Sequence, residues 1–114
     1  MTTHTMNLQK EPFDKIKNGT KIIESRLYDE KRQLIKVGDA ITFICTDGEK
    51  PESVTVTVQA LFLYPSFTAM MSELSAGWFG HTKSQDAIDE INQFYSTDDQ
   101  KKFGVVGIRI SKII

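Results

Sequence analysis

A long run of alternating residues at positions 54–64 constrains the fold more than any other feature of this chain. Its apolar members recur at every second position and are separated mainly by Thr and Gln: Val54, Val56, Val58, Ala60 and Phe62. A period of two is typical of a β-strand that buries one face. An apolar run at residues 40–45 and the turn-forming pair Asp47-Gly48 come just before it. Together these segments predict an antiparallel hairpin.

Other segments predict further strands and a first helix. The remaining strand-forming segments are residues 5–8, 21–27 and 103–114. Pro12 suits the first turn of a helix over residues 12–18, and Gly19 suits its C-terminal end. The polar residues 28–33 predict a single helical turn, and Gly38 supplies a positive φ angle after it.

The second half of the chain predicts three more helices. Ser66 is expected to cap a helix whose apolar residues have helical spacing: Phe67, Met70, Met71 and Leu74. Ser84 is expected to cap a second helix with Ile88, Ile91 and Tyr95 on one face, and Thr97 opens a capping-box pattern for a short third one. The predicted strands lie near the start, in the middle and at the end of the chain, and helices separate them. This order predicts an α+β domain built on a small, mostly antiparallel barrel.

Size and composition predict an ordinary soluble domain. The chain has 114 residues, which suits one domain over residues 1–114 and leaves no room for a second core. The only cysteine, Cys45, lies in an apolar segment, where a buried thiol is expected. No apolar segment approaches the roughly 20 residues of a membrane span, and residues 1–9 lack the layout of a signal peptide. We therefore expect a cytoplasmic protein with no membrane partner.

The charge is nearly balanced overall but unevenly distributed. The formal net charge of -1 argues against a large basic surface for nucleic acid. Residues 1–40 carry eight Lys and Arg against six acids, a balance of +2, and residues 41–114 carry six against nine, a balance of -3. Any anion-binding site is therefore expected in the first third, unless these charges only face solvent.

The strongest local signal is the group Gly19, Lys21, Glu24 and Arg26. It places an ammonium, a carboxylate and a guanidinium at a helix-to-strand junction, where they can bind an anion or move a proton. Strict alternation puts Glu24 and Arg26 on one face and Lys21 on the other, unless Lys21 still belongs to the turn. The alternative is an exposed Glu24–Arg26 salt bridge beside a solvated lysine.

Other candidate groups are weaker. No catalytic triad can be assembled, and four serines lack the flanking glycines of a nucleophile elbow: Ser66, Ser72, Ser75 and Ser84. His4 is expected to be a bystander at a frayed terminus. His81 lies in a loop that can border a pocket, and it is either a surface histidine, a ligand-binding residue or an acid–base group. No metal site and no cofactor are expected. Among the aromatic residues, Tyr28 and Trp78 stand in polar contexts and are the candidates for stacking on a base.

The pattern Gly19-x-Lys21-x-x-Glu24-x-Arg26 resembles the ASCH domain, particularly its bacterial single-domain members. The surrounding matches are residues 11–17 (EPFDKIK), 27–32 (LYDEKR), 37–39 (VGD), 95–96 (YS) and 102–108 (KFGVVGI). The resemblance implies a PUA-like β-barrel with a cleft beside the GxKxxExR segment. It also implies a role in RNA binding, coactivation or RNA-linked metabolism.

One branch related to this family hydrolyses the amide of acetylated cytidine with a lysine, a threonine nucleophile and a glutamate. The resemblance maps that lysine to Lys21, but Glu24 stands where the branch has its threonine. Residues 78–81 (WFGH), where the branch has its glutamate, contain none. A carboxylate cannot replace the nucleophilic hydroxyl without a change of mechanism.

The first functional hypothesis is therefore a module that binds RNA or a small nucleoside or nucleotide. Lys21 and Arg26 would meet a phosphate or a base carbonyl, Glu24 would accept a hydrogen bond, and Tyr28, Trp78 and His81 would border the ligand. The alternative is a hydrolase for a modified nucleoside or RNA, in which Lys21 and Glu24 transfer protons and activate water. A third reading is a protein-interaction domain that uses the predicted helix at residues 67–74. The oligomeric state stays open.

Overall fold

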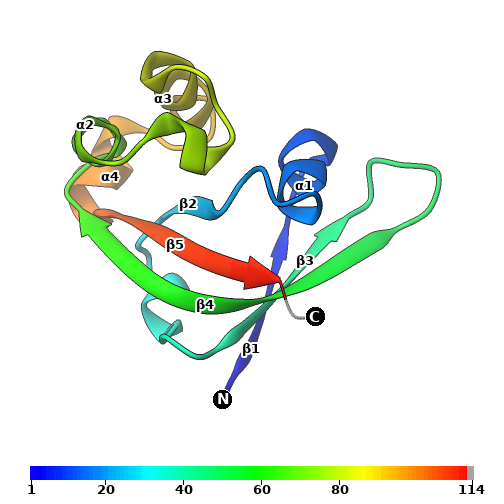
Figure 1. The fold of residues 1–114 in the computed structure, drawn as a ribbon. Coiled ribbons are helices and arrows are strands. Elements are labelled where there is room, and N and C mark those ends of the chain that lie inside the picture. The colour runs from blue at the N-terminus through cyan, green and yellow to red at the C-terminus, as the bar shows by residue number, and fades with distance from the viewer. Residues whose placement is uncertain (113–114) are drawn as a thin grey trace.

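The computed structural model describes residues 1–112 as one mixed, five-stranded sheet with short helices around it (Figure 1). The strands are β1 (Thr3–Asn7), β2 (Ile23–Leu27), β3 (Ala40–Cys45), β4 (Glu52–Tyr64) and β5 (Val105–Lys112). The α-helices are α1 (Lys10–Lys17), α2 (Phe67–Glu73), α3 (Ser84–Asn92) and α4 (Thr97–Phe103), with 3-10 turns η1 (Arg32–Leu34) and η2 (Ala76–Phe79). Within the described residues, no helix is long and apolar enough to cross a lipid bilayer.

The sheet is mostly antiparallel and curls into a half-barrel. The strand order is β1-β3-β4-β5-β2, and only the β1–β3 pair is parallel. The 13-residue strand β4 bends along its length, with a bulge between Val58 and Ala60, so it belongs to both ends of the sheet (Figure 1). A bulge increases local twist and bends the strand that carries it. The α+β, mostly antiparallel barrel with packed helices is confirmed in this form.

Two apolar clusters fill the two ends of the curled sheet. The first lies where α1 packs on the sheet, with Phe13, Ile41 and Phe43 fully buried, and it includes the free thiol of Cys45. The second lies between β2, β5 and the helices α2 to α4, around Phe67. The buried thiol predicted from the sequence is confirmed.

Most predicted elements exist, with shifted ends. Ser66 caps α2 as expected, because its hydroxyl accepts a hydrogen bond from the Ala69 amide at 3.1 Å. Ser84 is not the cap of α3: the helix begins at this residue, and Lys83 precedes it with no side-chain cap. For α4 the capping hydroxyl belongs to Ser96, which accepts from the Asp99 amide at 3.1 Å, and Thr97 is the first helical residue. The cap assignments at Ser84 and Thr97 were wrong by one position, an error typical of helix ends.

His4 is not at a frayed terminus. It lies in β1, and its Nε2 is 2.8 Å from Asp39 Oδ2. The Asp39 carboxylate also accepts hydrogen bonds from the Lys36 and Thr2 amides, at 3.0 and 3.2 Å. The hydrogen bond from His4, followed by those from the two amides, lowers the pKa of Asp39 to about 2. The strand predicted at residues 5–8 lies at Thr3–Asn7, and its parallel pairing with β3 orders the terminus around His4 that the sequence predicted to be frayed.

Candidate functional site

The turn between α1 and β2 sets up the site. Gly19 ends the helix at a φ of 85°, in the left-handed region that glycine tolerates best. Lys21 lies before β2 begins, and its backbone N–H donates to the Lys15 carbonyl at 3.0 Å. Freed from strand alternation, its side chain turns to the same face as Glu24. This is the arrangement in which Lys21 still belongs to the turn.

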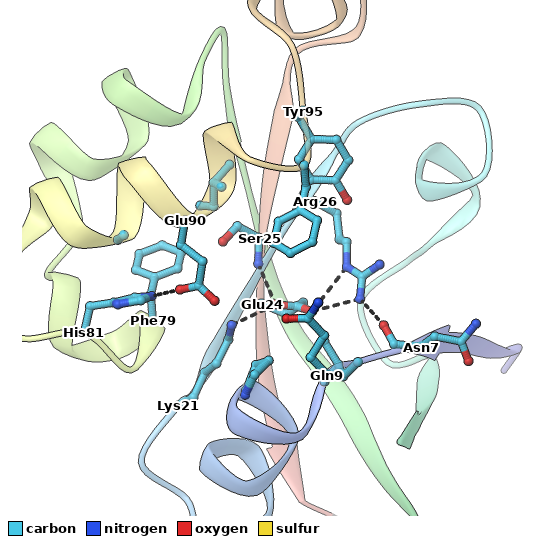
Figure 2. Close-up of a pocket in the computed structure, with 15 residues that line it drawn as sticks. Asn7, Gln9, Lys21, Glu24, Ser25, Arg26, Phe79, His81, Glu90 and Tyr95 are labelled. Carbon is cyan, nitrogen blue, oxygen red and sulfur yellow. Dashed lines mark hydrogen bonds and ion pairs between the residues drawn. The ribbon is translucent and has the colours of Figure 1, made fainter. Parts of the chain in front are cut away.

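Strand β2 is an edge strand, because it pairs with β5 alone. Its free edge opens onto a pocket of about 150 Å³ between the start of α1 and the helix α3 (Figure 2). The polar lining residues are Asn7, Gln9, Lys21, Glu24, Ser25, Arg26, His81, Glu90 and Tyr95, and the apolar ones are Leu8, Pro12, Phe79, Ala87, Ile91 and Phe94. The pocket therefore has a charged floor and an apolar wall.

Glu24 is the centre of the floor. Its Oε1 lies 3.0 Å from Lys21 Nζ and also accepts from the Ser25 amide at 3.2 Å. Its Oε2 accepts from the Arg26 guanidinium, at 3.2 Å from Nε and 3.0 Å from a terminal nitrogen, which also donates to the Asn7 carbonyl at 2.9 Å. The two cations thus hold one carboxylate from both sides, as Figure 2 shows.

The ion cluster is buried, not a surface salt bridge. Lys21 is 9% exposed and Glu24 is 3% exposed. Burial raises the pKa of Glu24, but the charges and hydrogen bonds of Lys21 and Arg26 outweigh it, and the pKa is lowered overall. Burial lowers the pKa of Arg26, but the effects of Glu24 and the nearby Tyr95 hydroxyl outweigh it, and the pKa is raised overall. Glu24 and Arg26 are therefore charged at neutral pH. The burial of the cluster shows that the alternative of an exposed pair beside a solvated lysine is wrong.

The floor keeps hydrogen-bond donors for a ligand. An ammonium group has three donor hydrogens, and among the described residues the one recorded partner of Lys21 Nζ is Glu24. Glu24 in contrast accepts from four donor nitrogens on three groups and has little capacity left to accept further hydrogen bonds. The arrangement suits binding of a carbonyl, a ring nitrogen or a phosphate oxygen better than proton abstraction by Glu24.

A second polar pair lies at the wall of the pocket. His81 follows η2, and its Nε2 is 2.6 Å from Glu90 Oε2 on α3. Sequence reasoning found His81 but missed Glu90. The signal was available, because Ala87, Glu90 and Ile91 lie three or four residues apart and share one helix face. In the described part of the chain, no group of three or more His, Cys, Asp or Glu could hold a metal ion.

Two predicted ligand-binding residues lie outside this pocket. Tyr28 is partly buried against the first apolar cluster, and Trp78 is 45% exposed on η2. Neither belongs to the pocket lining. From the predicted set, the structure thus brings together Lys21, Glu24, Arg26 and His81. The aromatic side chains that line the pocket are those of Phe79, Phe94 and Tyr95, not those of Tyr28 and Trp78.

Comparisons with known proteins agree with this architecture. The ASCH domain family model matches residues 6–114. The hypothetical protein PH0355, known from a crystal structure, is 37% identical, with a TM-score of 0.84 over 98% of this chain and 100% of its own. Protein PF0455 from Pyrococcus furiosus, solved by NMR, is 36% identical, with a TM-score of 0.76 over 98% of each chain. No curated protein matches. The chain therefore belongs to the ASCH domain family.

Proposed function

We propose that this protein binds RNA or a small nucleoside or nucleotide in the pocket beside its GxKxxExR segment. The observation that carries the proposal is the buried Lys21–Glu24–Arg26 floor beneath an apolar and aromatic wall. Cationic donors suit the oxygen atoms and ring nitrogens of a nucleotide, and aromatic walls suit its base. Membership in the ASCH family, whose members are associated with RNA, points the same way.

The dimensions favour a short ligand. A cavity of about 150 Å³ is large enough for one six-membered aromatic ring. A net charge of -1 gives little attraction for a long duplex. We therefore assign the pocket to the six-membered, base-pairing ring of one nucleobase, which belongs to a free nucleotide or to an unpaired position in RNA. Phe94 and Tyr95 take the stacking role that the sequence suggested for Tyr28 and Trp78.

The proposal is tested by titration calorimetry with nucleoside monophosphates and a short single-stranded RNA. Phe94 lines the pocket but is 56% exposed, so Phe94→Ala removes a stacking surface and leaves the core in place. The variant is expected to bind about tenfold more weakly, the typical effect of removing one stacked aromatic. Leu63 is equally exposed, at 56%, and lies outside the pocket lining, so Leu63→Ala is the matched control. Equal effects of both changes, or no binding by the unmodified protein, would contradict the proposal.

The second candidate is a hydrolase for acetylated cytidine or RNA. The observation in its favour is the 3.0 Å contact between Lys21 Nζ and Glu24 Oε1, a distance suited to proton transfer. The lowered pKa of Glu24 and its four donors make it a weak base, so we place binding first. Incubation of the protein with both substrates, alongside Lys21→Ala and Glu24→Ala, separates the two. Turnover that both variants abolish would establish the enzyme, and unchanged substrates would exclude these two activities.

A further inference from the structure

We infer that Glu90, held by His81, makes this pocket selective for nucleobases that carry an exocyclic amino group. The bases meant are cytosine and adenine, in which the amino group stands beside an unprotonated ring nitrogen on the base-pairing edge, in contrast to the keto bases uracil and hypoxanthine. The inference rests on the proposed function, because it concerns the edge of a base bound in the same pocket. It adds a hydrogen-bond acceptor, contributed by α3, to the donors of the floor.

The first step is the orientation of Glu90. Its Oε2 lies 2.6 Å from His81 Nε2, which fixes one carboxylate oxygen. Figure 2 shows the carboxylate reaching from α3 toward the floor, with His81 on one side and Lys21 on the other. In the part of the chain that the structure describes, His81 is the one side-chain partner recorded for the Glu90 carboxylate. The other oxygen is therefore available to accept a hydrogen bond from a ligand.

The second step is that His81 is itself fixed. Its backbone N–H donates to the Ala76 carbonyl at 3.0 Å, next to Gly80 with a φ of 84°. The His81 side chain is 18% exposed, and that of Glu90 is 39% exposed. The pair therefore joins the η2 loop to α3 at a site that is partly shielded from water, where a polar contact discriminates more strongly than on an open surface.

The third step compares the pocket with the edges of the bases. Glu90 offers an acceptor, and Lys21, on the neighbouring side, offers donors. An amino group beside an unprotonated ring nitrogen presents a donor and then an acceptor, which complements this order. A keto base reverses both positions, because it turns a carbonyl oxygen toward the carboxylate and an N–H toward the ammonium. One site cannot satisfy both edges, so the mismatched base leaves polar groups in the partly shielded pocket unpaired.

Two matched pairs of nucleotides test how the pocket recognises the amino or keto edge of the base. Cytidine and uridine monophosphates differ in the amino or keto group and the adjoining ring nitrogen, and so do adenosine and inosine monophosphates. By titration calorimetry, the unmodified protein is expected to bind the amino member of each pair about tenfold more tightly. In Glu90→Gln the amide can donate as well as accept, so the ratio is expected to fall to about twofold or less. The control is Asp89→Asn, an identical charge change one residue away and outside the pocket lining.

His81 is a positioning residue, and its role has a separate signature. His81→Ala releases Glu90 and is expected to reduce the ratio, whereas His81→Gln keeps a side-chain donor and is expected to restore part of it. Circular dichroism verifies that each variant is folded. A preference that persists in Glu90→Gln, or one that Asp89→Asn also removes, would overturn the inference. Equal binding of both members of each pair would overturn it while leaving the proposed function standing, and absence of any nucleotide binding would overturn both.

Discussion

At the scale of single residues, the site depends on Glu24. A lone buried carboxylate is costly, and so are two buried cations without an anion. The cluster is stable because Lys21 and Arg26 surround one carboxylate with donors at about hydrogen-bond distance. We therefore expect Glu24 to have mainly a structural role, in which it holds the side chains of Lys21 and Arg26 in place for a ligand.

This role predicts a large effect of Glu24→Gln on stability. The change keeps the shape of the side chain but removes the anion between two buried cations, so the free energy of unfolding is expected to fall by about 3 kcal/mol. Urea denaturation followed by circular dichroism measures it. Glu73→Gln is the control, because Glu73 is exposed and accepts one hydrogen bond from the Tyr64 hydroxyl. A loss no greater than that of the control would mean that the cluster does not support the fold.

Sequence reasoning reached this residue set only in part. The GxKxxExR segment was visible because its members lie within eight residues and match a known family. The burial of the cluster was not visible, since an alternating charged strand is equally compatible with an exposed edge. Glu90 was missed for a different reason: its position on one helix face with Ala87 and Ile91 could be read from the sequence, but its partner His81 lies in a loop whose direction the sequence does not define.

At the scale of elements, Asp39 joins β1 to the turn before β3. It accepts from His4 in β1 and from the Thr2 and Lys36 amides, so one carboxylate fixes both the N-terminal strand and the turn. The parallel β1–β3 pairing begins at this point, with Thr3 opposite Ala40. The position of β1 is therefore expected to depend on the charge of Asp39.

This dependence predicts how stability changes with pH. The folded pKa of Asp39, about 2, lies below its ordinary value of 3.8, so the charged carboxylate stabilises the folded state above about pH 4. That contribution is lost as the pH falls from about 4 toward 2, because the carboxyl group then becomes protonated in the folded state as well. In urea denaturation, the stability difference between the unmodified protein and Asp39→Asn is expected to shrink over this range.

Asp86 provides the control for the pH experiment. It is exposed on α3 and has no recorded ion pair among the described residues. The difference between the unmodified protein and Asp39→Asn should shrink more between pH 4 and pH 2 than the difference between the unmodified protein and Asp86→Asn. A constant difference for Asp39→Asn over this range would contradict the role given to the Asp39 carboxylate.

At the scale of the whole molecule, the two apolar clusters share one sheet. Val56 and Val58 of β4 belong to the first cluster, and Phe62 and Tyr64 of the same strand pack against the second. Strand β5 is shared in the same way. Because neither cluster has a sheet of its own, the molecule is expected to unfold as one cooperative unit.

Two core variants test this cooperativity. Phe43 in the first cluster and Phe67 in the second are both 0% exposed, and truncation of either to alanine is expected to cost about 3–5 kcal/mol. The single tryptophan, Trp78, lies on η2 and reports on the second end, whereas far-UV circular dichroism reports on both ends. In urea, the two signals should change together in both variants. Separate transitions for Phe43→Ala would show that the ends unfold independently.

The sequence alone determined the elements of this fold and its family. Alternation in β4, apolar spacing in α2 and the hydroxyl of Ser66 act within a few residues, where backbone geometry relates position directly to structure. The mixed α+β class follows from these local features, whereas the ASCH resemblance follows from the GxKxxExR motif and the matches around it. The parallel neighbour of β3 did not follow, because β1 is separated from it by α1 and β2, and no local pattern identifies such a partner.

Only the tertiary structure decided how the site is built. The Asn7 carbonyl, the Lys21–Glu24–Arg26 floor and the His81–Glu90 pair come from separate parts of the chain and meet at the free edge of β2. Their distances depend on how the sheet curls and where α3 packs, which are collective properties of the apolar clusters. The GxKxxExR residues thus supplied the charges, and the packing of the whole chain buried them together and turned them toward a pocket.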